Sequence, residues 1–264
     1  MTKRSFSAFL LSGVFVLAIS ANPLRAETEQ TIPTRDDVTL SFVVTEPDGP
    51  VKYVAILFAG GSGKIKLWKG HGPRGNNFLV RSRARFAQRG VLTITMDVPS
   101  DRRRKGLIFW RDSNEYRQDI AAVINWIKEK EKAPLWLIGT SRGSVSVAHL
   151  AGSLPVDGAV FTATVTEVSK ANKPTAYDAD LKKIKVPSLI VHHKEDACIV
   201  TPVDSLPAFA AALKNAPKVE TIIFEGGDPD ISGPCKARSA HGFLGIEDRV
   251  VGRIIDWMHA NAPK

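Results

Sequence analysis

Repetition of any kind is missing from this sequence, which has no internal repeat, no low-complexity tract and no stretch that resembles a flexible linker. These absences exclude a solenoid array and a pair of tethered domains. Past residue 26 there is also no apolar segment of the roughly 20 residues that a membrane-spanning helix needs. The 264 residues, 44% of them hydrophobic, can bury a sizeable core. We therefore predict one domain over residues 27–264 without a stable membrane span.

The first 26 residues have the layout of a secretory signal peptide. Lys3 and Arg4 precede an apolar stretch from Phe6 to Ile19, and small residues follow it as far as Ala26. The apolar stretch is shorter than the roughly 20 residues of a membrane span. We expect cleavage after Ala21 or Ala26 and a mature protein that is periplasmic or secreted. An uncleaved membrane anchor is the alternative.

Cysteine is scarce, with only Cys198 and Cys235 in the chain. An exported protein meets oxidising conditions, so an even number of cysteines favours a disulfide. We predict a bridge between the two, and a pair of free buried thiols is the alternative.

Basic residues outnumber acidic residues, and the formal net charge is +9. The basic residues form two conspicuous groups, one of Arg81, Arg83, Arg85 and Arg89 and one of Arg102, Arg103, Arg104 and Lys105. Neither group is interleaved with aromatic residues as a platform for single-stranded nucleic acid would be, and no nucleic-acid partner is predicted. We expect both basic groups to lie on the solvated surface. Anionic substrates, envelope polymers or lipid headgroups are the alternative partners.

Short apolar, β-branched runs alternate with segments of helical periodicity. The runs predict strands at 38–45, 53–58, 91–96, 135–138, 159–165, 188–192 and 221–224. The periodic segments predict helices at 77–88, 114–128, 144–150, 204–213 and 248–259. This alternation predicts an α/β fold with a mainly parallel central sheet and helices on both faces. Active sites on such sheets lie at the carboxyl ends of the strands.

One of those strand ends carries the motif Gly-Thr-Ser-Arg-Gly at residues 139–143, followed by a helical segment. A nucleophile on a sharp strand-to-helix turn requires a strained backbone, and glycines on either side let the strand and helix approach each other. Ser141 is therefore the candidate nucleophile. The alternative is a serine that only caps the helix.

A serine nucleophile needs a base, and the base needs an orienting acid. In this kind of fold, both follow the serine along the chain. Asp196 lies just past the predicted strand 188–192, with Glu195 as its competitor. His241 lies in a loop among small residues before the last helix and is the candidate base. The other histidines fit the order or the loop position less well: His71, His149, His192, His193 and His259.

A glycine-rich segment, Gly-Gly-Ser-Gly at residues 60–63, follows the strand 53–58. Its backbone N–H groups can approach a substrate oxygen, so we expect the N–H of Gly61, or that of its neighbour, to pair with the N–H of Arg142 as an oxyanion hole. A phosphate-binding loop is excluded here. That pattern requires glycine where Phe58 stands and serine or threonine where Ile65 stands.

Together these segments resemble the α/β-hydrolase superfamily over about residues 31–260. The resemblance implies the α/β-hydrolase fold, a catalytic triad of Ser141, Asp196 and His241, and an oxyanion hole of Gly61 and Arg142. It implies no cofactor and no metal. Ala59 departs from the family pattern, because many members have histidine there.

The segment 166–186, where many lipases carry an apolar lid, is short and mostly polar. No large lid is expected, and a small or medium, partly polar ester fits better than a triglyceride. We expect an exported carboxylic-ester hydrolase that acts through an acyl-enzyme. The alternatives are a serine peptidase or acyltransferase with the same triad and a non-catalytic binding domain on the same fold. The sequence leaves the oligomeric state open.

Overall fold

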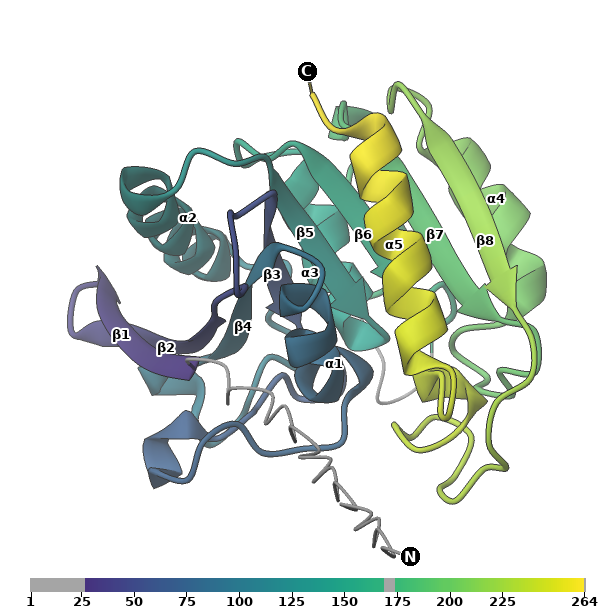
Figure 1. Ribbon diagram of the computed structural model, residues 1–264, viewed down its shortest axis with the longest axis horizontal. Coiled ribbons are helices and arrows are strands. Elements are labelled where there is room, and N and C mark those ends of the chain that lie inside the picture. The colour runs from purple at the N-terminus through teal and green to yellow at the C-terminus, as the bar shows by residue number, and fades with distance from the viewer. Residues whose placement is uncertain (1–26, 169–173, 264) are drawn as a thin grey trace, which may run out of the picture.

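A single open sheet organises the computed structural model, which describes residues 27–168 and 174–263 (Figure 1). The eight strands lie in the order β1-β2-β4-β3-β5-β6-β7-β8. Their bounds are β1 Glu27–Arg35, β2 Val38–Thr45, β3 Tyr53–Phe58, β4 Val91–Pro99, β5 Leu135–Thr140, β6 Gly158–Thr162, β7 Ser188–His193 and β8 Val219–Phe224. The strands from β4 to β8 in this order run parallel, and β2 and β1 continue the sheet in antiparallel pairing.

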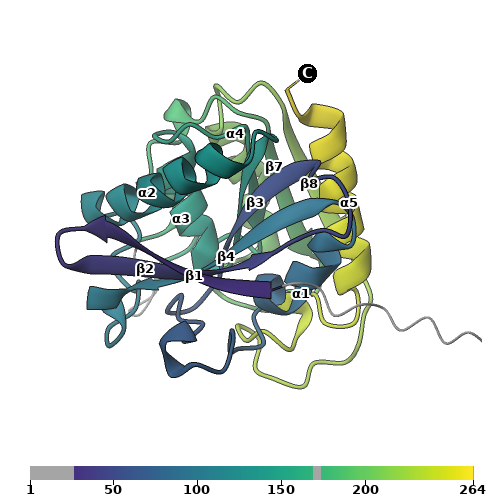
Figure 2. The same cartoon turned by 60° about the vertical axis from the view of Figure 1, so that its left-hand side comes forward.

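Among the described residues, five α-helices cover both faces of the sheet (Figures 1 and 2). They are α1 Phe78–Ala87, α2 Asn114–Lys130, α3 Arg142–Ala151, α4 Leu206–Ala212 and α5 Glu247–Asn261. Short 3-10 helices occupy several connections: η1 Leu67–Lys69, η2 Ser100–Arg102, η3 Ala176–Asp178, η4 Leu181–Lys183, η5 Val203–Ser205 and η6 Ala240–Gly242. Helices α1 and α5 lie on one face, and α2, α3 and α4 lie on the other. The predicted fold class is confirmed.

The central strand β3 explains why both faces must be covered. Its residues Val54, Ile56 and Phe58 pack toward α2 and α3. The residues between them, Tyr53, Ala55 and Leu57, pack toward α1 and α5. Successive side chains of a strand point to opposite faces, so a strand that is apolar at every position needs a helical layer on each side.

The seven predicted strands are all present, and β1 is an additional one. Its sequence is mostly polar, contains Pro33 and lies exposed at the sheet edge, so it lacks the apolar run on which the prediction depended. Strand β6 ends at Thr162, earlier than predicted, because Ala163 takes a positive φ of 44°.

The leader predicted for residues 1–26 lies outside the described residues. Within the described ranges, none of the helices combines the length and the apolar character needed to cross a bilayer.

Candidate active site

Ser141 lies on the turn that joins β5 to α3. Its backbone takes φ 52° and ψ −127°, outside the regions that residues with a side chain normally adopt. A conformation of this kind costs about 1–3 kcal/mol, and the surrounding structure must hold it. The N–H of Ser141 donates to the carbonyl oxygen of Thr162, and its own carbonyl oxygen accepts from the N–H of Ser144. The turn thus fixes the serine hydroxyl at the carboxyl edge of the sheet.

The two glycines of the motif are required by close backbone approach. A Cβ atom at Gly139 would collide with the carbonyl oxygen of Gly143. A Cβ atom at Gly143 would collide with the carbonyl oxygen of Phe58, at the end of β3. Neither position therefore has room for a methyl group, which is the steric reason that the sequence pattern gives for glycine there.

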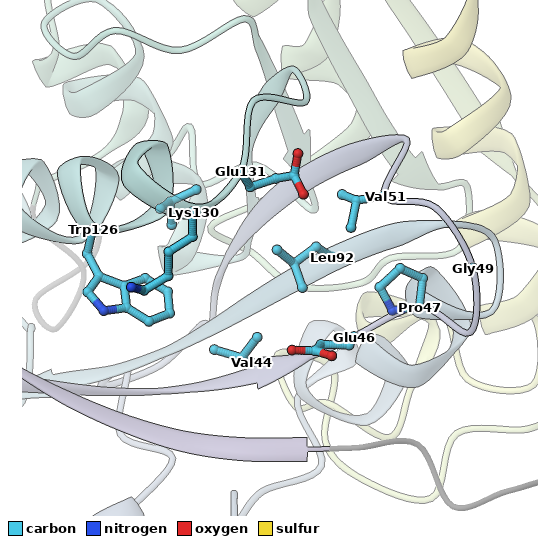
Figure 3. A pocket seen from close by; sticks show the side chains of 10 residues that line it. Val44, Glu46, Pro47, Gly49, Val51, Leu92, Trp126, Lys130 and Glu131 are labelled. Atoms are coloured by element: carbon cyan, nitrogen blue, oxygen red, sulfur yellow. The ribbon is translucent and has the colours of Figure 1, made fainter.

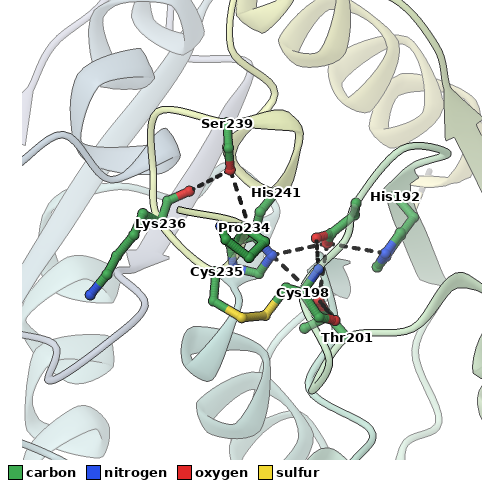
Figure 4. Close-up of a disulfide and its surroundings, with 9 residues drawn as sticks. His192, Cys198, Thr201, Pro234, Cys235, Lys236, Ser239 and His241 are labelled. Atoms are coloured by element: carbon green, nitrogen blue, oxygen red, sulfur yellow. Dashed lines mark hydrogen bonds and ion pairs between the residues drawn. A yellow bond between two sulfur atoms is a disulfide. The ribbon is translucent and has the colours of Figure 1, made fainter. Parts of the chain in front are cut away.

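Asp196 and His241 meet, as their positions in the sequence predicted. His241 Nδ1 donates to Oδ2 of Asp196 at 2.9 Å, and both side chains are buried. The same carboxylate accepts from the Thr201 hydroxyl at 2.9 Å on Oδ2 and from the N–H of Cys198 at 3.0 Å on Oδ1 (Figure 4). Both carboxylate oxygens are thus occupied, and the acid cannot rotate freely.

The Asp196 carboxyl is held as a carboxylate. Burial raises the pKa of Asp196, but the polar contact with His192 and the hydrogen bonds from His241 and from the N–H of Cys198 outweigh burial and lower that pKa well below its usual range. A permanent negative charge beside Nδ1 fixes the tautomer in which the other nitrogen, Nε2, is free to accept a proton.

The competing acid, Glu195, lies elsewhere. Its side chain is exposed and pairs with Nδ1 of His193 at 2.9 Å. No contact between Glu195 and His241 is found among the described residues. The geometry therefore favours Asp196 as the partner of the histidine.

A pocket of about 230 Å³ brings the serine and the histidine together. Ser141 and His241 both line it, together with Gly60, Gly61 and Asn77. Nε2 of His241 is buried and has no hydrogen-bond partner among the described residues, so it is not bonded to the serine hydroxyl. Such hydrogen bonds often form only when substrate is bound.

Of the two predicted oxyanion-hole residues, Gly61 lines this pocket, and Arg142 directly follows Ser141 in the chain. Gly61 has a positive φ of 58°. A Cβ atom at the preceding Gly60 would approach Cβ of Ser141 and the carbonyl oxygen of Thr140 to 3.0 Å. Arg142 is the first residue of α3, where helix N–H groups have no intrahelical partner. The glycine segment and the start of α3 thus both lie next to Ser141, and the oxyanion hole itself stays a prediction.

Arg111 supports the glycine segment from inside the protein, which the sequence did not reveal. Its Nη2 donates to the carbonyl oxygens of Ala59 and Gly61 at 2.9 and 3.3 Å, and its Nη1 donates to the Ser146 hydroxyl at 2.7 Å. Burial lowers the pKa of Arg111 to about 10. The bonds to Ala59 and Gly61 turn those carbonyl groups inward.

Cys198 and Cys235 form the predicted disulfide, with their Cα atoms 4.6 Å apart. Cys198 lies two residues after Asp196, and Cys235 lines the pocket with Ser141. The bridge therefore ties the loop that carries the acid to the wall of the pocket (Figure 4).

A second hollow, of about 290 Å³, lies at the opposite edge of the sheet (Figure 3). Val44, Val51, Leu92 and Trp126 provide its apolar lining, and Lys130 and Glu131 lie at the end of α2 beside it. It is remote from the carboxyl ends of the parallel strands, so it takes no part in the arrangement around Ser141.

No protein-family model and no curated protein matches this sequence. Solved structures do resemble it. A serine hydrolase homologue from Coxiella burnetii is 19% identical with a TM-score of 0.62, and the match covers 86% of this chain and 97% of that one. A dienelactone hydrolase from Anabaena variabilis is 15% identical with a TM-score of 0.64, covering 90% and 99%. A cold-adapted esterase from an Arctic intertidal metagenomic library is 15% identical with a TM-score of 0.63, covering 90% and 94%. At sequence identities this low, the similarity shows a shared fold and nothing further.

Proposed function

We propose that this chain, which has the α/β-hydrolase fold, is a serine hydrolase that cleaves small carboxylic esters through an acyl-enzyme. The observation that carries the proposal is the buried hydrogen bond between Asp196 and His241 at the pocket that Ser141 also lines. A non-catalytic domain has no need to keep an ordered acid, a base with a free nitrogen and a strained serine at one pocket.

In the first half of the reaction, Oγ of Ser141 adds to the ester carbonyl carbon, and its proton moves to Nε2 of His241. The carbonyl electron pair moves onto oxygen, where the N–H groups of Gly61 and Arg142 stabilise the charge. Asp196 stabilises the imidazolium through Nδ1. The intermediate collapses, the leaving oxygen takes the proton from Nε2, and an alcohol departs from the acyl-enzyme.

Water completes the cycle by the same steps. His241 removes a proton from water, the resulting oxygen nucleophile attacks the acyl-enzyme carbonyl, and the N–H groups again bind the oxyanion. The Ser141 oxygen leaves, takes the proton from His241 and is regenerated as a hydroxyl, and the carboxylic acid departs. Atoms and charge balance without any group beyond ester and water.

The size and lining of the pocket support a small substrate. Its volume of about 230 Å³ is modest, and polar groups of Asn77 and Lys236 line it beside Phe78. This pocket suits a short acyl group with polar substituents, as the polar segment 166–186 also suggests. The esterase among the similar structures supports the same substrate class.

Export is part of the proposal. The leader-like residues 1–26 and the Cys198–Cys235 bridge are both typical of a protein that acts outside the cytoplasm. We place the mature enzyme in the periplasm or outside the cell.

Labelling by a fluorophosphonate probe tests the proposal, because the probe reacts with an activated serine and not with a capping one. The native protein should label and should hydrolyse aryl acetates. Ser141→Ala should do neither, with turnover lower by on the order of 10⁴–10⁶. The matched control is Ser153→Ala, which removes an exposed serine just past the other end of α3. Labelling that survives in Ser141→Ala would refute the assignment.

A further inference from the structure

The two basic groups of the sequence differ in their surroundings. The arginines of α1 and Arg89, just past its end, all face carboxylates: Arg81 pairs with Glu247, Arg83 with Glu27, and Arg85 and Arg89 with Asp248. Their positive charge is neutralised within the fold, mainly by ion pairs with acidic residues at the start of α5. This group needs no external partner.

The second basic group is joined by a further set of cations from a neighbouring loop. Nζ of Lys64 donates to the carbonyl oxygen of Arg104, and the N–H of Leu107 donates to the carbonyl oxygen of Ser62. The segments 62–75 and 100–107 therefore lie side by side. Together they form what we call the cationic surface: Lys64, Lys66, Lys69, Arg74, Arg102, Arg103, Arg104 and Lys105. The sequence separates these residues by up to 41 positions, so it did not predict their association.

The positive charge of the cationic surface is not neutralised within the fold. In the described ranges, none of its eight residues forms an ion pair with a carboxylate. The two acidic residues nearest in sequence are already engaged. Asp97 is buried and accepts hydrogen bonds from the N–H groups of Ile65 and Leu67, and Asp101 forms an ion pair with Arg35. Eight like charges on two adjoining loops attract an anionic partner.

Aromatic side chains accompany these cations. The guanidinium of Arg102 lies 4.5 Å from the ring centre of Trp110, and that of Arg103 lies 5.7 Å from the ring centre of Trp68. Beside them, Phe109 is 57% exposed. A platform for single-stranded nucleic acid needs free ring faces for base stacking, whereas both tryptophan rings are already occupied by guanidinium groups. Basic residues beside an exposed phenylalanine suit the headgroup layer of a bilayer better.

The cationic surface borders the candidate active site. Gly61 lines the pocket, and Lys64 follows it by three residues on the same loop. Both loops leave the carboxyl ends of their strands, β3 and β4, which is also the edge of the sheet at which Ser141 lies (Figure 1). A protein bound through this surface therefore holds the rim of its pocket close to the layer that it is bound to.

We propose that the cationic surface docks this protein on an anionic phospholipid bilayer. The guanidinium and ammonium groups lie against lipid phosphates, and the Phe109 ring enters the headgroup layer. This inference goes beyond the proposed hydrolase activity and does not depend on it, because docking needs no catalysis.

Co-sedimentation with vesicles tests the docking. We would use Ser141→Ala protein recovered from cells that express the full chain, so that no lipid is hydrolysed. Vesicles that mix phosphatidylglycerol with phosphatidylcholine should bind it, vesicles of phosphatidylcholine alone should not, and salt should release it. Equal binding to both vesicle types, or to neither, overturns the proposal. Fluorophosphonate labelling of the native serine is read separately, so the two proposals can fail independently.

Removing charge from the cationic surface tests whether this surface binds the bilayer. The combined change Arg103→Gln, Arg104→Gln and Lys105→Gln should weaken vesicle binding about 100-fold, because each basic residue near an anionic bilayer contributes about fivefold. The matched control, Lys185→Gln, Lys214→Gln and Lys218→Gln, removes the same charge from exposed positions that precede β7 and β8 at the opposite edge of the sheet. An equal loss in the control would show a net-charge effect and refute the assigned surface. Melting temperatures confirm that both variants fold.

Phe109→Asn separates a bilayer from a soluble polyanion. Phe109 has a positive φ of 59°, a conformation that asparagine tolerates, so the variant should fold. It should weaken binding to the phosphatidylglycerol vesicles severalfold while leaving the binding of a single-stranded oligonucleotide unchanged. Oligonucleotide binding tighter than vesicle binding, unaffected by Phe109→Asn, would replace the bilayer with a polyanion and overturn the proposal.

Discussion

Nε2 of His192 lies 3.3 Å from Oδ2 of Asp196. Both side chains are fully buried, and Oδ2 is the atom to which His241 also donates. The contact has an ion-pair distance but lacks the alignment of a good hydrogen bond, and Nδ1 of His192 has no hydrogen-bond partner among the described residues. The candidate acid therefore lies between two imidazole rings, of which only His241 lines the pocket.

His192 should act as a positioning residue for Asp196. His192→Phe keeps a ring of similar shape but removes the contact to the carboxylate. A polar contact without good hydrogen-bond alignment contributes about 0.5–1.5 kcal/mol, so we expect kcat for an aryl acetate to fall by about two- to tenfold with little change in KM. His192→Gln, which can still donate an N–H, should recover part of the loss. Equal kcat in all three proteins would contradict this role.

Asp196 and Glu195 should differ sharply when each is replaced by its amide. Asp196→Asn removes the charge that orients and stabilises the imidazolium, and kcat should fall by on the order of 10⁴. Glu195→Gln alters an exposed side chain that contacts His193 only, so its kcat should stay near that of the native protein. Steady-state kinetics on the purified pair decides between them, and the reverse order would make Glu195 the acid.

Asp196 should also link stability to pH. Its pKa is lowered in the folded protein by its hydrogen bonds, so the unfolded chain takes up the proton first as the pH falls. The stabilisation is present above the unfolded pKa of about 3.9 and is lost as the pH falls toward the folded value. Denaturant unfolding should therefore show a smaller loss of stability below about pH 4 in Asp196→Asn than in the native protein. If the free energy of unfolding falls equally with pH in the two proteins, the pKa of Asp196 is not lowered in the folded state.

The disulfide should hold the acid loop against the pocket. Replacing Cys198 and Cys235 by serine opens a loop of 37 positions and should lower the free energy of unfolding by roughly 3–4 kcal/mol. If the bridge also keeps Asp196 in register with His241, turnover measured well below the melting temperature should fall as well. Unchanged turnover there would mean that the bridge only stabilises. Two alkylatable thiols in protein from the exported fraction, found by mass spectrometry, would show that no bridge forms.

The sequence predicted the sheet and the order of Ser141, Asp196 and His241 because each depends on a local pattern: an apolar run, a glycine-flanked turn, an acid at a strand end. It missed β1, whose residues are mostly polar and exposed and which pairs with β2 at the edge of the sheet. It also missed Thr201 and Arg111, since a threonine and an arginine at unremarkable positions become parts of the site only through contacts made in three dimensions.

The contact of Gly139 with Gly143, and of Gly143 with Phe58, joins the ends of β3 and β5 to the start of α3 through main-chain atoms. Side-chain packing nearby affects stability, but the position of the Ser141 hydroxyl is set by backbone geometry. Conservative substitutions in the surrounding core should therefore leave Ser141 in place, whereas a single added methyl group at either glycine would displace it. Replacement of either glycine is therefore expected to disturb the Ser141 turn more than most substitutions in the core around it.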